Sequence, residues 1–339
     1  MFFRLGQSIE WGPIKRYIAP PSDYEKWARI CEHIILHYNE GWADGFNYGI
    51  KYWEIWNEPE MPPMWLGTPE DFYRLYDVTA KHLKERFPHM SIGGYASCGF
   101  PEVTRKECTD HELTIMPHFR GFLDYVKEHK PPVDFFSWHI YSHNTEEILT
   151  QAAYAKNALN DAGLSDIETF LTEWNHFDAF KRQGMAGACY VGGSLCALQC
   201  AGTLDGAMYY AAAASPGYNG LYNPVTRTLD KPYYAFSAFN TLYKLGGFVM
   251  SECDIPYMYT CAAKNETDGA VMIVNSSEKA HCISINLNGL DNKTTSGVYI
   301  LDADHNLELM NCISFGGSDA HITLEIKEQS IILIELKMD

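Results

Sequence analysis

Several protein classes are excluded by what this 339-residue sequence lacks. It has no apolar run close to the roughly 18–20 residues of a membrane span, so we expect no integral membrane protein and no membrane partner. It also has no segment rich in lysine and arginine. Its 26 basic residues stand against 43 acidic ones, which gives a formal net charge of −17. This acidic excess argues against nucleic acid or an anionic membrane surface as a partner.

Motifs for metal binding, disulfides and export are missing as well. The ten cysteines include no C-x-x-C pair and no zinc-finger spacing with histidine, and a disulfide framework is not expected in a chain of this size. No signal peptide is recognisable, so a cytoplasmic location is the default expectation. No cofactor and no metal are expected, and the sequence leaves the oligomeric state open.

The first 247 residues alternate between short apolar strands and amphipathic helices. The predicted strands are 2–8, 50–57, 90–96, 133–141, 167–174 and 204–212, and the predicted helices are 23–40, one starting at 68, 113–129, 145–161, 185–201 and 232–245. This repetition predicts an α/β fold with a parallel sheet, either open or closed. A closed (β/α)8 TIM-type barrel is favoured, because no Gly-rich phosphate turn follows a strand and polar residues gather at the strands' carboxyl ends.

A different pattern begins after Gly247. Residues 252–339 contain short alternating strands, such as 269–274, 281–285 and 330–336, separated by turn signals such as Asn288-Gly289. The sequence therefore predicts two domains, a catalytic barrel over 1–247 and an accessory β-sandwich over 252–339.

Two glutamates stand at the ends of predicted strands. Glu58 follows strand 50–57 within Trp-Glu-Ile-Trp-Asn-Glu-Pro, and Glu173 ends strand 167–174 within Leu-Thr-Glu-Trp. Two carboxylates on different strands of one barrel can converge on a single bond, as glycoside hydrolysis requires. Each glutamate alone would more often cap a helix or pair with arginine, but the two together favour the catalytic interpretation.

A third strand end carries His139 and Tyr141. Because side chains alternate along a strand, both residues lie on the same side as Ser137. If that side faces the lumen, His139 can bind substrate hydroxyls and Tyr141 can hydrogen-bond a carboxylate. A buried histidine that is satisfied within the core is the alternative.

These three segments together resemble glycoside hydrolase family 39, the clan A group of retaining β-xylosidases and α-L-iduronidases. The resemblance covers about residues 1–250 and implies a barrel followed by a β-sandwich. It implies that Glu58 is the acid/base, that Glu173 is the nucleophile, and that the substrate is a glycoside or oligosaccharide of the β-xylosidase type. It also implies substrate contacts, which we assign to Asn57, His139, Tyr141, Trp56, Trp65 and Trp174.

The resemblance also predicts an incomplete barrel. If Glu58 ends the fourth barrel strand and Glu173 the seventh, then residues 2–8 form the third strand and the first two strands are absent. We therefore expect six of eight barrel strands in this chain, with two unpaired edges.

Two other functions remain open at this stage. One is a carbohydrate-binding or inactive relative, which the loss of two strands would favour and the presence of both carboxylates opposes. The other is a metal-dependent barrel hydrolase, which would require a cluster of His and Asp ligands and is not favoured.

Overall fold

The computed structural model describes residues 1–6, 13, 17–212, 221–223, 225–290 and 293–338. Backbone contacts divide the chain into two compact units, which we describe separately. Unit 1 comprises Met1–Ile140, Thr150–Trp174 and Thr203–Met208, and unit 2 comprises Tyr141–Leu149, Asn175–Gly202 and Tyr209–Asp339.

Unit 1 is built around a sheet of six strands that follow one another in chain order. The pairs β1–β2, β2–β3 and β3–β4 are parallel, as alternating strands and helices predict. The six strands are β1 (Phe2–Leu5), β2 (Tyr52–Ile55), β3 (Ser91–Ser97), β4 (Phe135–Ser142), β5 (Glu168–His176) and β6 (Gly206–Tyr209). The last residues of β4, β5 and β6 fall in unit 2.

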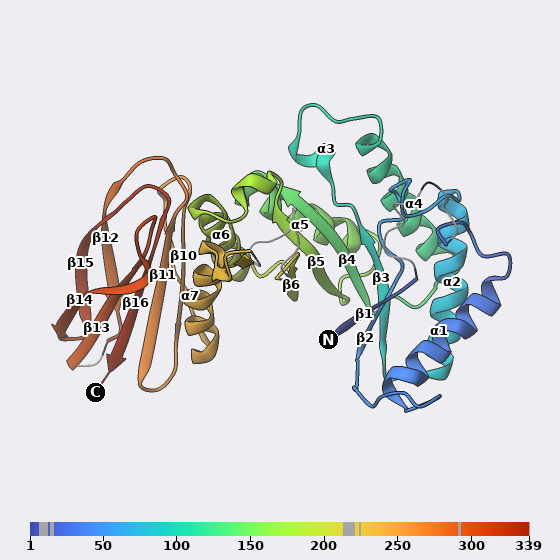
Figure 1. The fold of residues 1–339 in the computed structure, drawn as a ribbon, viewed down its shortest axis with the longest axis horizontal. Coiled ribbons are helices and arrows are strands. Elements are labelled where there is room, and N and C mark those ends of the chain that lie inside the picture. Colours follow the sequence, from blue (N-terminus) through green and yellow to red (C-terminus); the bar gives the residue numbers. More distant parts are fainter. Residues whose placement is uncertain (7–12, 14–16, 213–220, 224, 291–292, 339) are drawn as a thin grey trace. The chain divides into compact units, whose positions relative to one another are not determined.

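Helices connect these strands, and Figure 1 shows α1, α2 and α4 side by side next to β1–β3. The helices up to β5 are α1 (Tyr24–Asn39), α2 (Pro69–Arg86), the short α3 (Pro101–Thr104), α4 (Glu112–His129) and α5 (Thr145–Asp161), and a 3-10 turn spans Ala179–Lys181. The start of α2 is fixed by a capping box, in which Thr68 accepts from the backbone N–H of Asp71 and the Asp71 carboxylate accepts from that of Thr68.

Unit 2 contains an antiparallel β-sandwich. A six-stranded sheet in the order β14-β13-β16-β11-β10-β9 and the β12–β15 pair enclose one apolar core. The strands of unit 2 that follow β6 are β7 (Tyr222–Asn223), β8 (Thr228–Leu229), β9 (Gly247–Val249), β10 (Met258–Lys264), β11 (Asp268–Asn275), β12 (His281–Asn288), β13 (Lys293–Leu301), β14 (Asn306–Gly316), β15 (Asp319–Ile326) and β16 (Ser330–Met338). Both sheets supply this core with branched residues, among them Ile273, Ile283, Ile322, Ile326, Ile332 and Ile334.

Two helices, α6 (Met185–Ala201) and α7 (Lys231–Leu245), also belong to unit 2 and contact its larger sheet. Two adjacent glycines let α6 approach closely: a Cβ on Gly192 would lie 2.9 Å from side-chain atoms of Met272 and Ile331, and one on Gly193 would lie 2.7 Å from Tyr259. Both helices had been expected to belong with the barrel. The boundary between independently folding domains, predicted at 247–252, stays a prediction.

The predicted element types are confirmed, and most boundaries agree within two or three residues. The first strand is the main difference, because β1 ends at Leu5, whereas Gln7 and Ser8 lie outside the described residues. Within the described ranges, no helix combines the length and the apolar character needed to cross a membrane.

Candidate active site

Glu58 lies just beyond β2, in a backbone conformation that is unusual for residues other than glycine. Its φ is +44°, and that of Trp56 is +71°. Backbone hydrogen bonds hold both residues, because Trp56 donates to the carbonyl of Leu5 at 2.9 Å and Glu58 donates to that of Ala96 at 3.0 Å. Strained backbone that neighbouring strands hold in place is typical of functional sites.

Gly6, which follows β1, makes room for this arrangement. Its φ is +102°, and a Cβ there would lie 2.5 Å from the Trp56 ring. Any other residue at this position would displace the Trp56 ring, which lies two residues before Glu58.

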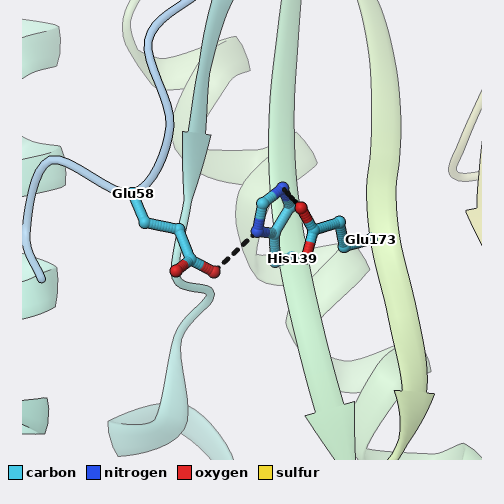
Figure 2. Close-up of side chains that lie close together, drawn as sticks. All are labelled: Glu58, His139 and Glu173. Carbon is cyan, nitrogen blue, oxygen red and sulfur yellow. Dashed lines mark hydrogen bonds and ion pairs between the residues drawn. The ribbon is translucent and has the colours of Figure 1, made fainter. Parts of the chain in front are cut away.

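His139 lies between the carboxylates of Glu58 and Glu173, as Figure 2 shows. Its Nδ1 is 2.7 Å from a Glu58 oxygen, and its Nε2 is 3.7 Å from a Glu173 oxygen. The predicted strands thus bring both glutamates to one place, with oxygens within 4.8 Å of one another.

Arg4 of β1 completes the cluster. Its Nε donates to Glu54 at 2.6 Å and its Nη1 donates to Glu173 at 3.0 Å, while its Nη2 lies 3.2 Å from Nε2 of His139. Because a guanidinium only donates, a neutral His139 accepts from Arg4 at Nε2 and donates from Nδ1 to Glu58.

The Arg4–Glu54 pair was not identified from the sequence. Glu54 is 2% exposed and also accepts from the hydroxyl of Thr172 at 3.0 Å. The β1–β2 register places Arg4 directly opposite Glu54. One sequence signal could have revealed this pair: Arg4 and Glu54 are each a charged residue in the middle of an apolar strand. A charge at such a buried position needs a partner of opposite charge.

The charges of this cluster act on one another. Burial lowers the pKa of Arg4, but the carboxylates of Glu54 and Glu173 outweigh it and the pKa is raised. Burial likewise lowers the pKa of His139, and again Glu173 and Glu58 outweigh it, so that its pKa is raised. Arg4 therefore stays cationic beside Glu173.

A second buried carboxyl group, Glu60, lies two residues beyond Glu58. It accepts from the Ser97 hydroxyl at 2.8 Å and from the Cys98 thiol at 3.6 Å. Burial, with a smaller contribution from the charge of Glu58, raises the pKa of Glu60 to about 7. Sequence reasoning did not identify this residue.

Glu58, His139 and Glu173 also have the spacing of a metal site, since each offers one ligand atom. The guanidinium of Arg4 lies beside Nε2 of His139 and beside Glu173, so a cation is already present at that position. A divalent metal would have to displace or repel Arg4, and the donor set fits it poorly.

The remaining predicted contacts are mostly buried. Trp56, Trp65 and Trp174 are 1%, 4% and 0% exposed, and Asn57 is 2% exposed. The indole N–H groups of Trp56 and Trp65 donate to the backbone carbonyls of Met64 and Thr68. This burial favours a role in the core over stacking on a sugar, and the substrate contacts stay predictions.

Tyr141 is half-buried and falls in unit 2. There the guanidinium carbon of Arg182 lies 5.4 Å from the centre of its ring. Its predicted role as the partner of Glu173 also stays a prediction.

The family model "Glycosyl hydrolases family 39" matches residues 12–176, a range that contains Glu58, His139 and Glu173. This part of the chain resembles family 39. A β-xylosidase from Geobacillus stearothermophilus is 32% identical over 134 residues, which are 38% of this chain and 23% of that protein. A β-xylosidase from Caldicellulosiruptor saccharolyticus is 29% identical over 175 residues, 48% of this chain and 32% of that protein. The matches thus span about a quarter to a third of these curated relatives.

Solved structures share the fold of this chain. A glucosidase from Croceicoccus marinus superposes with a TM-score of 0.77 at 20% identity, covering 100% of this chain and 78% of that one. A monomeric β-xylosidase from Caulobacter crescentus gives a TM-score of 0.73 at 16% identity, covering 98% and 77%. The fold is therefore an α/β architecture with a parallel sheet and additional antiparallel sheets.

Proposed function

We propose that this chain is a retaining glycoside hydrolase that acts on substrates of the β-xylosidase type. The observation that carries the proposal is the Glu58–Glu173 pair, whose oxygens lie within 4.8 Å of one another beside His139. Retaining enzymes hold their two carboxyl groups about 5–5.5 Å apart, whereas inverting enzymes leave room for a water between them. The relatives named as β-xylosidases support the substrate class.

In the proposed mechanism Glu173 attacks the anomeric carbon and forms a glycosyl-enzyme, while Glu58 protonates the leaving oxygen. Glu58 then deprotonates the water that releases the sugar. Arg4 orients Glu173 through the Nη1 contact at 3.0 Å. His139 holds Glu58 through Nδ1 at 2.7 Å and thereby fixes the spacing of the two groups.

The test is hydrolysis of 4-nitrophenyl β-D-xyloside, with the product anomer followed by proton NMR. We expect β-xylose to form first. We also expect Glu58→Ala to lower kcat by about 10²–10⁴-fold, the usual contribution of a general acid. Glu173→Ala should abolish turnover, and azide should restore part of it. Glu128→Ala, which removes an exposed carboxylate of α4, serves as the control.

Unchanged turnover in either glutamate variant would overturn the assignment. Binding of xylosides by the wild-type chain without hydrolysis would identify an inactive, carbohydrate-binding relative instead.

We further propose that β1–β6 occupy the third to eighth positions of an eight-stranded barrel. The chain-order sheet, with β1 and β6 as its outer strands, supports this placement. Extending the chain at its amino end with two further βα units should then raise both thermal stability and kcat/KM, because the added strands pair with open edges. A chain that gains neither would contradict the placement.

A further inference from the structure

Unit 2 contains a cavity of about 600 Å³, which we call the unit 2 cavity. Several parts of the chain meet around it: the segment after β4, the end of β5, the 3-10 turn at Lys181, the first half of α6, the turn before β10 and the β11–β12 turn, with Gln329 beside them. Its volume is within the range of about 300–1,000 Å³ typical of small-ligand sites. Its lining does not include Glu58, His139 or Glu173.

Aromatic faces form one part of its lining. Tyr257 is 56% exposed and has a φ of +61°, and its carbonyl accepts from the Ser276 N–H at 2.9 Å. His143 lines the cavity as well, with its ring 4.8 Å from that of Phe177, which is 52% exposed. Exposed aromatic rings on a fixed backbone can stack against the apolar face of a ligand ring.

Polar groups form the other part, on a turn that the fold holds rigidly. The buried Asn275 side chain donates to the carbonyls of Lys279 and Lys327, both at 2.8 Å, and accepts from the Ser277 hydroxyl at 2.7 Å. Ser276 ties the same turn to α6 by donating to the carbonyl of Cys189 at 3.3 Å. The turn is therefore preorganised, and its residues Ser277, Glu278 and Lys279 line the cavity.

The lining does not fit a metal or a second hydrolytic site. It includes three histidines, but the group of described side chains with metal-site spacing is Glu58, His139 and Glu173. It includes a single acidic residue, Glu278, whereas glycoside hydrolysis needs two carboxyl groups. The combination of aromatic faces with hydroxyl, amide and charged groups is that of a saccharide site, where rings stack and hydroxyls are hydrogen-bonded.

We propose that the unit 2 cavity is a non-catalytic saccharide-binding site of this chain. Tyr257 supplies the stacking face, and the β11–β12 turn supplies the polar contacts. The choice of a xylo-oligosaccharide as its ligand rests on the proposed function.

The test measures xylotetraose binding by isothermal titration to the full chain carrying Glu173→Gln, which prevents turnover. In this background Tyr257→Ala should weaken one binding event about three- to tenfold, the loss expected for one aromatic contact. Tyr257→Phe should retain binding, because it keeps the ring. Tyr243→Ala, which removes an exposed ring of α7 outside the cavity, is the matched control and should leave binding unchanged. Urea unfolding checks that each variant is folded.

A second variant, Lys279→Met, keeps the side-chain stem but removes a donor on the rigid turn and should also weaken binding. Binding that neither Tyr257→Ala nor Lys279→Met alters would overturn the proposal, even if the wild-type chain hydrolyses xylosides. Conversely, a wild-type chain that hydrolyses nothing but shows Tyr257-dependent binding would overturn the proposed function and leave this site standing.

Discussion

At the scale of single residues, Arg4 connects the stability of this protein with its proposed chemistry. It is the cationic partner of both Glu54 and Glu173, and the Glu54 side chain is 3% exposed. Removing one member of a buried ion pair leaves the other charge without compensation. The same guanidinium donates at 3.0 Å to Glu173, the proposed nucleophile.

We therefore expect Arg4→Met to lower the free energy of unfolding by about 3 kcal/mol and to reduce kcat. The matched control is Arg105→Met, which breaks the Arg105–Glu112 pair, whose side chains are 24% and 23% exposed. That control should lose at most about 1 kcal/mol and keep its activity. Urea unfolding and xyloside hydrolysis measure the two effects, and equal losses in both variants would contradict the role of Arg4.

Glu60 predicts a specific dependence of stability on pH. Its pKa is raised to about 7 by burial, so between about pH 4.5 and 7 the folded protein holds a proton that the unfolded chain has released. The stability that this proton supplies is complete at low pH and is lost as the pH rises through 7. The complete loss lowers the free energy of unfolding by about 3 kcal/mol.

Glu60→Gln removes this titration while keeping the size of the side chain. The stability of the wild type relative to Glu60→Gln should fall between pH 4.5 and 7.5, measured as urea midpoints in buffers of equal ionic strength. A difference between the two proteins that does not change with pH would show that Glu60 titrates normally.

At the scale of elements, helix starts and strand register place the site. The Thr68–Asp71 capping box sets the first turn of α2, directly after the segment that contains Glu58 and Trp65. The β1–β2 register sets Arg4 against Glu54. A change in either element would therefore move groups of the candidate site.

The capping box gives an element-scale prediction. Thr68→Ala removes the hydroxyl that accepts from the Asp71 N–H at 3.2 Å and should cost about 1 kcal/mol of stability. Thr68→Ser keeps that hydroxyl and should cost far less. Thermal unfolding followed by circular dichroism compares the two, and equal losses would mean that the methyl group rather than the cap matters.

At the scale of the whole molecule, the helix α6 belongs to unit 2 and packs against its large sheet. Met272, Val274 and Ile331 of the large sheet are fully buried and lie against the Gly192 face of α6. A sandwich cut out at the predicted domain boundary would expose these side chains to water.

We accordingly expect a polypeptide of residues 252–339 to bind an apolar dye such as ANS and to unfold with weak cooperativity. A longer polypeptide of residues 185–339 keeps α6 and α7 and should bind less dye. Dye fluorescence and urea unfolding distinguish the two, and equally cooperative unfolding of both would show that the sandwich folds without these helices.

Sequence alone predicted most elements because their signals are local. The helix expected at 23–40 is Tyr24–Asn39, since its apolar period and the Asp23 cap lie within a few turns of one another. The positions of Glu58 and Glu173 were predictable too, because parallel strands present their carboxyl ends on one side of a sheet. The Arg4–Glu54 pair could not be predicted in this way, since its members are 50 residues apart and meet only through the strand register.

What the sequence determined by itself, then, was the alternation of elements and the positions of Glu58 and Glu173 near strand ends, since periodicity, caps and strand ends act over short distances along the chain. The tertiary structure decided which charge compensates which carboxylate, how deeply Glu60 and the predicted stacking tryptophans are buried, and that α6 packs on the sandwich. These features depend on side chains distant in sequence that share one dry environment, where burial raises the cost of an unpaired charge.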